Sequence, residues 1–274
     1  MKKVLALMLA LLMLLTLVAC SDEEETRENE DFDMAVTTNE NVYKATNGDE
    51  FLYDYLGGDV VITGFRGAEE PHDVTVPAKI HDRDVVEIAA GAFYNKTNIE
   101  SVEIPAGIEK IGDFAFANCS KLEAVSIPTT VYEIGQAAFA KCILIEEIAF
   151  TYPEQTGVAE KDRKDVVLGE MAFYGCQSLG KVTLPADLTE IADQTFMGCK
   201  SLMVLEWGTK IEKIGAYAFC GCKALSTVTV PTSLSKIGDC AFMNTGLSST
   251  WLEGKGSIEL GATVFQQVEI EENN

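Results

Sequence analysis

The sequence is poor in the residues and patterns on which most enzymes and nucleic-acid-binding proteins depend. It has only two histidines, His72 and His81, and neither stands in a metal-ligand or nucleophile motif. It also lacks a phosphate-binding glycine loop, an H-E-x-x-H helix and a G-x-S-x-G turn. The net charge of −22 leaves no basic footprint that could displace counterions from DNA or RNA. These absences predict a protein that is not an enzyme, uses no cofactor or metal and binds no nucleic acid.

The one apolar run of notable length stands at the N-terminus. Lys2 and Lys3 precede an uncharged stretch over residues 4–18, which is typical of an export signal and lacks the length and flanks of a membrane-spanning helix. Its end, L-V-A-C, resembles the bacterial lipobox. The resemblance implies that residues 1–19 are a lipoprotein signal peptide and that Cys20 is the lipid attachment site, so that the exported protein is anchored to the bacterial cell membrane and faces outside. The alternative is a simple secretion signal in which Cys20 is incidental.

Residues 20–41 carry much of the charge imbalance. Eleven of the 43 acidic side chains lie between Cys20 and Glu50, against only Arg27 and Lys44. This composition predicts an acidic, disordered linker between the anchor and the folded part.

Phenylalanine recurs at a fixed period over most of the chain. Six of the seven intervals are 23 residues, and the interval from Phe139 to Phe173 is 34 residues, which is the same period with an eleven-residue insertion. The copies are Phe93, Phe116, Phe139, Phe173, Phe196, Phe219, Phe242 and Phe265. An isoleucine or leucine stands five residues before each copy and is followed by glycine or alanine. This repetition predicts a solenoid, because a single coil cannot bury these side chains until another coil lies against it.

Each repeat also carries a strand pattern. Apolar residues stand nine and eleven residues after the phenylalanine, as at Val102 and Ile104, and proline closes four of these strands. The unit I-G-x-x-A-F-x-x-C-x-x-L-x-x-V-x-I-P resembles the BspA-type leucine-rich repeat of bacterial surface proteins, over about residues 60–268. The resemblance implies a leucine-rich-repeat solenoid of the α/β type with about eight coils, a parallel β-sheet on the concave face and short helical turns opposite.

The ends and the interruption of the repeat set the predicted domain limits. Residues 42–82 form the N-terminal cap and first coil, in which two apolar segments flank Gly57-Gly58-Asp59 as in a β-hairpin. Residues 83–274 carry the leucine-rich repeats. The insertion, residues 151–165, is either a tolerated surface loop or a specificity loop beside the binding face.

The cysteines mostly follow the repeat. Five of the eight stand three residues after a phenylalanine, and buried cysteine at such a position behaves as a small hydrophobe in the core. These five are Cys119, Cys142, Cys176, Cys199 and Cys222. Cys220 and Cys240 break this register, and they are candidates for a disulfide because they lie in adjacent coils of an exported protein.

The outward strand residues predict a binding face. The position ten residues after each phenylalanine is occupied by Glu103, Ser126, Ala149, Thr183, Glu206 and Thr229. The neighbouring position adds Glu100, Glu123 and Glu146, so the first half of the sheet is acidic. Trp207 occupies an inward position, whereas two registers are open for Trp251. In one register Trp251 points outward as an anchor for a sugar ring or a partner protein, and in the other it is a core residue.

Together these patterns predict a monomeric surface protein that binds an extracellular protein or glycan on its concave face. The candidate ligand-binding residues are Glu103, Ser126, Thr183, Glu206, Thr229 and Trp251. The alternative is a structural or scaffold protein of the cell envelope without a dedicated ligand. A third class, a hydrolase, would need a catalytic carboxylate pair, and nothing in the sequence picks one out.

Overall fold

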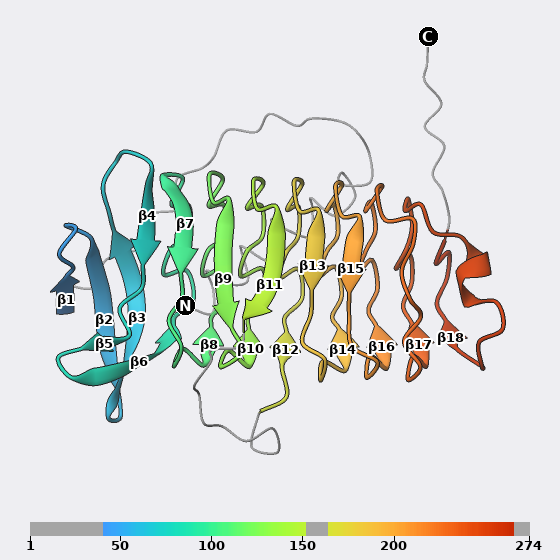
Figure 1. The fold of residues 1–274 in the computed structure, drawn as a ribbon, viewed down its shortest axis with the longest axis horizontal. Coiled ribbons are helices and arrows are strands. Elements are labelled where there is room, and N and C mark those ends of the chain that lie inside the picture. The colour runs from blue at the N-terminus through green and yellow to red at the C-terminus, as the bar shows by residue number, and fades with distance from the viewer. Residues whose placement is uncertain (1–40, 152–163, 266–274) are drawn as a thin grey trace, which may run out of the picture.

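The chain forms an elongated stack of coils (Figure 1). The computed structural model describes residues 41–151 and 164–265. The colours of Figure 1 run in order from blue to red along the long axis, so each coil lies beside its neighbours in sequence. The predicted solenoid of about eight coils is therefore confirmed. The insertion lies largely outside the described residues, as do the signal peptide, the linker and Cys20.

A six-stranded parallel sheet runs along one side of the stack. Its strands, in spatial order, are β15 (Val204–Glu206), β13 (Lys181–Thr183), β11 (Glu147–Thr151), β9 (Ala124–Pro128), β7 (Ile99–Glu103) and β4 (His72–Thr75). The coils are in register, so that Val102 of β7 lies opposite Val125 of β9. Both valines are buried, whereas Glu103 in the same strand is exposed. The predicted alternation of inward and outward strand residues is confirmed.

Two-residue strands form a second ladder where each coil begins. These strands are β8 (Lys110–Ile111), β10 (Glu133–Ile134), β12 (Val167–Leu168), β14 (Glu190–Ile191), β16 (Lys213–Ile214), β17 (Lys236–Ile237) and β18 (Glu259–Leu260). The first three extend the sheet of the N-terminal cap, and the last four form a sheet of their own. From β8 to β17 the second residue of each strand is a buried isoleucine or leucine, whereas the first points outward.

Antiparallel strands close the N-terminal end. β1 (Asn41–Lys44) pairs with β2 (Glu50–Leu56), and β2 pairs with β3 (Asp59–Arg66) in the predicted hairpin. β6 (Arg83–Ile88) then lies parallel to β3, and it also pairs with the short β5 (Lys79–Ile80). This arrangement covers the first phenylalanine of the stack, because the rings of Phe51 and Phe65 pack against Phe93.

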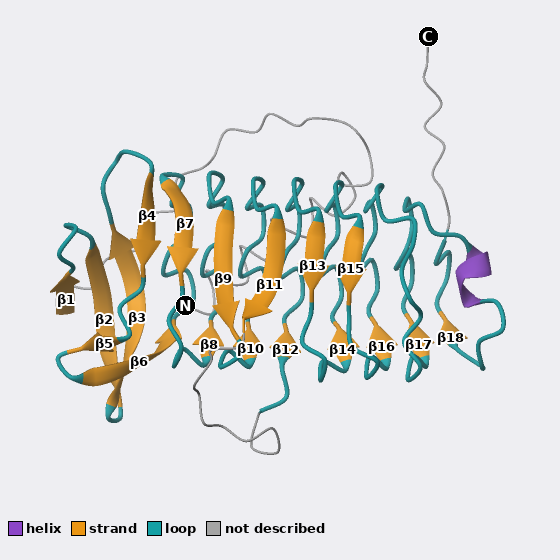
Figure 2. Cartoon of the chain, in the orientation of Figure 1, coloured by secondary structure: helices purple, strands orange, loops and turns teal. Residues whose placement is uncertain are grey.

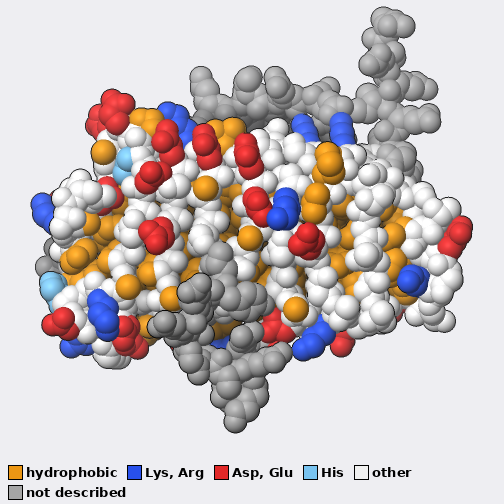
Figure 3. Space-filling view, in the orientation of Figure 1, with side chains coloured by type: hydrophobic (Ala, Val, Ile, Leu, Met, Phe, Trp, Pro, Cys, Tyr) orange, Lys and Arg blue, Asp and Glu red, His pale blue; other side chains and the backbone are white. Residues whose placement is uncertain are grey.

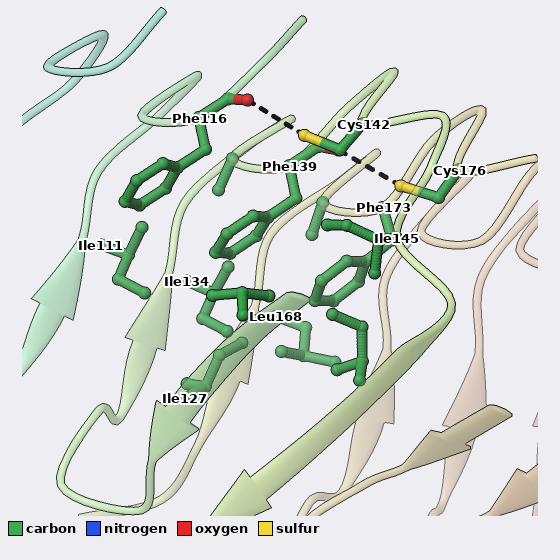
Figure 4. Packing of buried hydrophobic residues seen from close by; sticks show 14 of the residues in the cluster. Ile111, Phe116, Ile127, Ile134, Phe139, Cys142, Ile145, Leu168, Phe173 and Cys176 are labelled. Carbon is green, nitrogen blue, oxygen red and sulfur yellow. Dashed lines mark hydrogen bonds between the residues drawn. The ribbon is translucent and has the colours of Figure 1, made fainter. Parts of the chain in front are cut away.

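The repeated phenylalanines form one file through the core. Their ring centroids lie 4.7–5.8 Å apart from Phe93 to Phe265, and successive ring planes differ by at most 14°. Figure 4 shows three of the rings stacked above the isoleucine and leucine of the short strands. Burying such a side chain contributes roughly 1.5–3 kcal/mol, so the file is a major part of the stability of the stack.

The side of the stack opposite the six-stranded sheet consists of turns (Figure 2). Within the described residues the only helix is the single 3-10 turn Ser249–Leu252, so tight turns stand where short helical turns were expected. The amide of Phe114 donates to the Gln136 carbonyl of the next coil at 2.8 Å, and Phe116 donates to Ala138 at 2.7 Å. These bonds recur from coil to coil and form a backbone ladder on the turn side.

Each of these turns contains two left-handed residues. One stands two positions before the phenylalanine, as at Phe114 with φ 56°, and the other stands two positions after it, as at Asn118 with φ 61°. In the described residues the later position holds only asparagine or glycine except at Lys141, whose φ is 60°. Asparagine and glycine adopt this conformation with the least steric cost.

The glycine that follows the buried isoleucine is required by close packing of the coils. A Cβ atom on Gly112 would lie 2.5 Å from the backbone nitrogen of Ala90. The small residue at this repeat position therefore sets how closely two coils approach.

Candidate functional site

The candidate site is the outward side of β4, β7, β9, β11, β13 and β15, called here the sheet face. In Figures 1 and 2 these strands lie at the front, and no described helix or strand packs over them. The face therefore presents side chains from six neighbouring coils on one surface.

Four of the predicted binding residues form one row across this face. Glu103 pairs in register with Ser126, and Thr183 pairs with Glu206, while Ala149 lies between the two pairs. The Thr183 hydroxyl donates to Glu206 Oε2 at 3.2 Å. The structure thus brings Glu103, Ser126, Thr183 and Glu206 together, although their role in binding stays a prediction.

Thr229 continues this row less regularly, because no strand is assigned to residues 225–230. Instead of strand pairing, the indole N–H of Trp207 donates to the Thr229 carbonyl at 2.8 Å. The Trp207 ring is half-buried and lies edge-on to Phe219. Trp207 thus packs against the core, as predicted from its inward position.

Trp251 takes the inward one of its two open registers. The side chain is half-buried in the 3-10 turn, and its ring lies edge-on to Phe242 with the centroids 5.0 Å apart. Its indole N–H donates to the Val228 carbonyl at 2.7 Å. The expectation that Trp251 points outward as an anchor is therefore wrong, because the chain forms a 3-10 turn here and not a strand.

A second row crosses the face seven residues after each phenylalanine. We call it the rim row, and its members are Glu100, Glu123, Glu146, Gly180 and Met203. Backbone hydrogen bonds join the positions, as from the Glu123 amide to the Glu100 carbonyl at 2.8 Å. The three glutamates are exposed. In Figure 3 a row of acidic side chains is visible along the upper part of the face.

The ion pair between Lys181 and Glu147 leaves the rim glutamates unneutralised. Lys181 Nζ lies 2.7 Å from Glu147 Oε1 in the adjacent strand, and this hydrogen bond raises the pKa of Lys181. No cation of the described chain forms a comparable pair with Glu100, Glu123 or Glu146. The first half of the sheet face is therefore a negatively charged surface.

The second half of the face exposes apolar side chains that were not predicted as site residues. Met203 is 62% exposed and stands just before β15, and Val204, the first residue of β15, is 40% exposed. Their signal in the sequence is an apolar residue at repeat positions that hold polar residues in most other coils. The second half of the face therefore combines apolar side chains with the polar and charged ones of Thr183 and Glu206.

The cysteines belong to the core. The five thiols in repeat register are fully buried, and each donates to the phenylalanine carbonyl of the preceding coil, as Cys142 does to Phe116 at 3.1 Å (Figure 4). Burial raises the pKa of the Cys176 thiol to about 12. The core interpretation of this column is confirmed.

Cys220 and Cys240 are not joined by a disulfide in the structure. Cys240 Sγ lies 2.9 Å from Thr263 Oγ1, and Cys220 packs with Met197 in a second apolar cluster on the turn side. The proposed bridge stays a prediction that counting of thiols in the unreduced protein would test.

The described residues contain no group of three or more histidine, cysteine or acidic side chains placed to hold a metal ion. No helix among them has the length and apolar character needed to cross a membrane.

A family model described as a BspA type leucine rich repeat region matches residues 79–158 and 164–271 in six copies. No curated protein matches the chain.

Several solved structures share the fold. A leucine-rich repeat protein from Eubacterium ventriosum has a TM-score of 0.60 at 23% identity, covering 78% of this chain and 52% of that one. A leucine-rich repeat protein from Bacteroides ovatus has a TM-score of 0.55 at 22% identity, and the match covers 85% of this chain and 68% of that one. A leucine rich cell surface protein from Faecalibacterium prausnitzii has a TM-score of 0.55 at 21% identity, and the match covers 84% of this chain and 76% of that one.

Proposed function

The chain belongs to the BspA-type leucine-rich-repeat family of bacterial surface proteins, and on that premise we propose that it binds an extracellular protein or glycan on its sheet face. The observation that carries this proposal is the unpartnered sheet face itself. Six coils present exposed and half-exposed side chains there, among them Glu103, Thr183 and Glu206, and no described element covers them. None of these side chains belongs to the hydrophobic core.

The proposal includes a lipid anchor at Cys20. An exported protein held by acyl chains would present the stack to the outside, with residues 20–41 as the spacer. Metabolic labelling with a clickable fatty acid tests this part. The wild-type chain should incorporate the label and sediment with membranes, whereas Cys20→Ser should do neither. Equal labelling of both chains would refute the anchor.

Binding is tested with arrays of extracellular-matrix proteins and of glycans. The wild-type protein should bind at least one probe saturably, and the double variant Glu103→Lys, Glu206→Lys should lose that binding. Glu170→Lys is a control for charge reversal at a single site away from the sheet face, because Glu170 is exposed on the turn side. A ligand bound equally well by the double variant would place its site elsewhere.

The second candidate is a spacer or scaffold of the cell envelope with no dedicated ligand. It would be supported if no probe on either array bound saturably and if the sheet-face variants behaved as wild type in cells.

A further inference from the structure

The rim row is a regular line of surface positions whose side chains do not belong to the hydrophobic core. Its five positions follow one another across five adjacent coils, joined by the backbone hydrogen bonds from Glu123 to Glu100, Glu146 to Glu123, Gly180 to Glu146 and Met203 to Gly180 at 2.8–3.4 Å. The line begins with three exposed carboxylates and ends with a methionine that is 62% exposed. Figure 3 shows acidic side chains along the upper left part of the visible face, and hydrophobic, basic and acidic ones farther to the right.

The arrangement is unfavourable for the isolated protein in two ways. Like charges lie at equivalent positions of adjacent coils, whose strands are about 4.8 Å apart, so the three carboxylates repel one another. The apolar surface of Met203 and Val204 also stays in water. A ligand that is cationic at one end and apolar at the other would relieve both.

We propose that the rim row binds a cationic amphipathic α-helix of a partner protein, laid across the strands. This proposal rests on the proposed binding function and names the class of partner. Residues at positions i, i+3 or i+4, and i+7 of a helix rise by about 4.5–6 Å per step, which matches the spacing of adjacent strands. Alternate residues of an extended chain rise by about 6.6–6.8 Å and would lose register after two steps.

The same geometry fixes the partner's sequence pattern. Four strand spacings separate Glu100 from Met203, or about 19 Å, which a helix spans in about 13 residues. The partner helix would carry three lysines or arginines on one face, opposite Glu100, Glu123 and Glu146. An apolar residue on that face, 11 to 14 positions from the first cation, would contact Met203. Gly180 has no side chain to obstruct the helix between the two parts.

The test uses the purified full chain and labelled synthetic helices of 18 residues. The probe peptide has lysines at i, i+4 and i+7 and leucines at i+11 and i+14. In the control peptide the same residues are scattered around the helix. Fluorescence anisotropy should show at least ten-fold tighter binding of the probe than of the control. Raising the NaCl concentration from 50 to 500 mM should weaken probe binding about ten-fold, because exposed charges are screened.

Matched variants of the protein locate the site. Glu100→Gln, Glu123→Gln and Glu146→Gln together should weaken probe binding at least ten-fold, and Met203→Ser should weaken it about three-fold. The control triple variant Glu133→Gln, Glu190→Gln and Glu259→Gln removes the same charge from the short-strand ladder and should change binding less than two-fold. Circular dichroism and the melting temperature should confirm that all variants fold.

Each outcome is decisive. Failure of the probe to bind, equal binding of both peptides, or equal effects of the two triple variants would overturn the helix proposal. If, in that case, the arrays still identify a ligand that Glu103→Lys, Glu206→Lys abolishes, the binding function stands and only its partner class is wrong.

Discussion

The coils before the insertion and the coils after it share one period but carry unequal sheets. Strands β7, β9 and β11 have five residues each, β13 and β15 have three, and residues 225–230 have no assigned strand. The phenylalanine file continues unchanged, with ring centroids 5.4 Å apart at Phe196–Phe219 and 5.2 Å apart at Phe219–Phe242. The turn ladder also continues, as Cys240 donates to Ala262 at 2.9 Å. The core and the turn side therefore hold the coils together, and the sheet face is freer to vary.

The largest expected effect tests whether the core carries both halves equally. Phe139→Ala and Phe219→Ala each remove a fully buried ring with stacked neighbours on both sides. We expect each to lower the free energy of unfolding by about 3–5 kcal/mol in urea denaturation. A cost for Phe139→Ala less than half that of Phe219→Ala would mean that the regular sheet of the first half, and not the core, holds those coils together.

The next effect concerns the two tryptophans that replace strand pairing in the second half. Trp251→Phe keeps an aromatic ring but removes the hydrogen bond to the Val228 carbonyl, and Trp207→Phe removes the bond to Thr229. Each should cost about 1–1.5 kcal/mol. Hydrogen exchange should accelerate at residues 225–230 and stay unchanged in β7 and β9. Unchanged exchange throughout would show that the indole bonds do not stabilise this edge.

A smaller effect, of opposite sign, concerns Lys141 on the turn side. Lys141 has φ 60°, and desolvation lowers the pKa of its amine. Lys141→Asn should stabilise the protein by about 0.5–1 kcal/mol at pH 7, because asparagine tolerates this backbone conformation and carries no charge to desolvate.

The pH dependence of this gain follows from the sign of the shift. At pH 7 the unfolded chain binds the Lys141 proton more tightly than the folded chain does, so the charged amine destabilises the fold. That penalty falls as the pH rises through the folded pKa toward the ordinary lysine value of 10.5. The advantage of Lys141→Asn should therefore shrink between neutral pH and pH 10.5. Asn118 occupies the same repeat position in the preceding coil with φ 61°, so asparagine is already accommodated there. A gain that is constant with pH would assign the effect to the backbone alone.

The sequence predicts the repeated interior well because each buried position recurs in at least five coils. Phe, Ile and Leu recur in register, and the structure stacks them as expected. The left-handed residue after the phenylalanine also has a signal, since Asn and Gly occupy that position in all described coils but one. The left-handed residue before it has none, because Phe114, Met171 and Tyr217 are ordinary residues there. Hydrogen bonds to the next coil impose that conformation, and single-residue propensity does not reveal them.

The candidate site was predictable only in part, because outward positions do not repeat. Strand register places Glu103, Ser126, Thr183 and Glu206 in one row, which alternation alone predicts. Alternation could not predict the orientation of Trp251, because its segment leaves the repeat and folds as a 3-10 turn instead of a strand. Met203 and Val204 were not predicted as site residues, because the sequence shows only that they are apolar, whereas their exposure comes from the structure.

The smallest effect compares paired charges in the two halves of the short-strand ladder. Lys110 Nζ lies 2.8 Å from Glu133, and Lys213 Nζ lies 2.5 Å from Glu190, and these hydrogen bonds raise the pKa of both lysines. Because all four side chains are more than one-third exposed, Lys110→Met and Lys213→Met should each cost only about 0.2–0.5 kcal/mol, and 0.5 M NaCl should remove most of that cost. Equal small costs in urea denaturation would show that the ion pairs of this ladder contribute equally to stability in both halves, as is expected of the phenylalanine file. A markedly larger cost at Lys213 would indicate that the second half depends on its ion pairs where its strands are short.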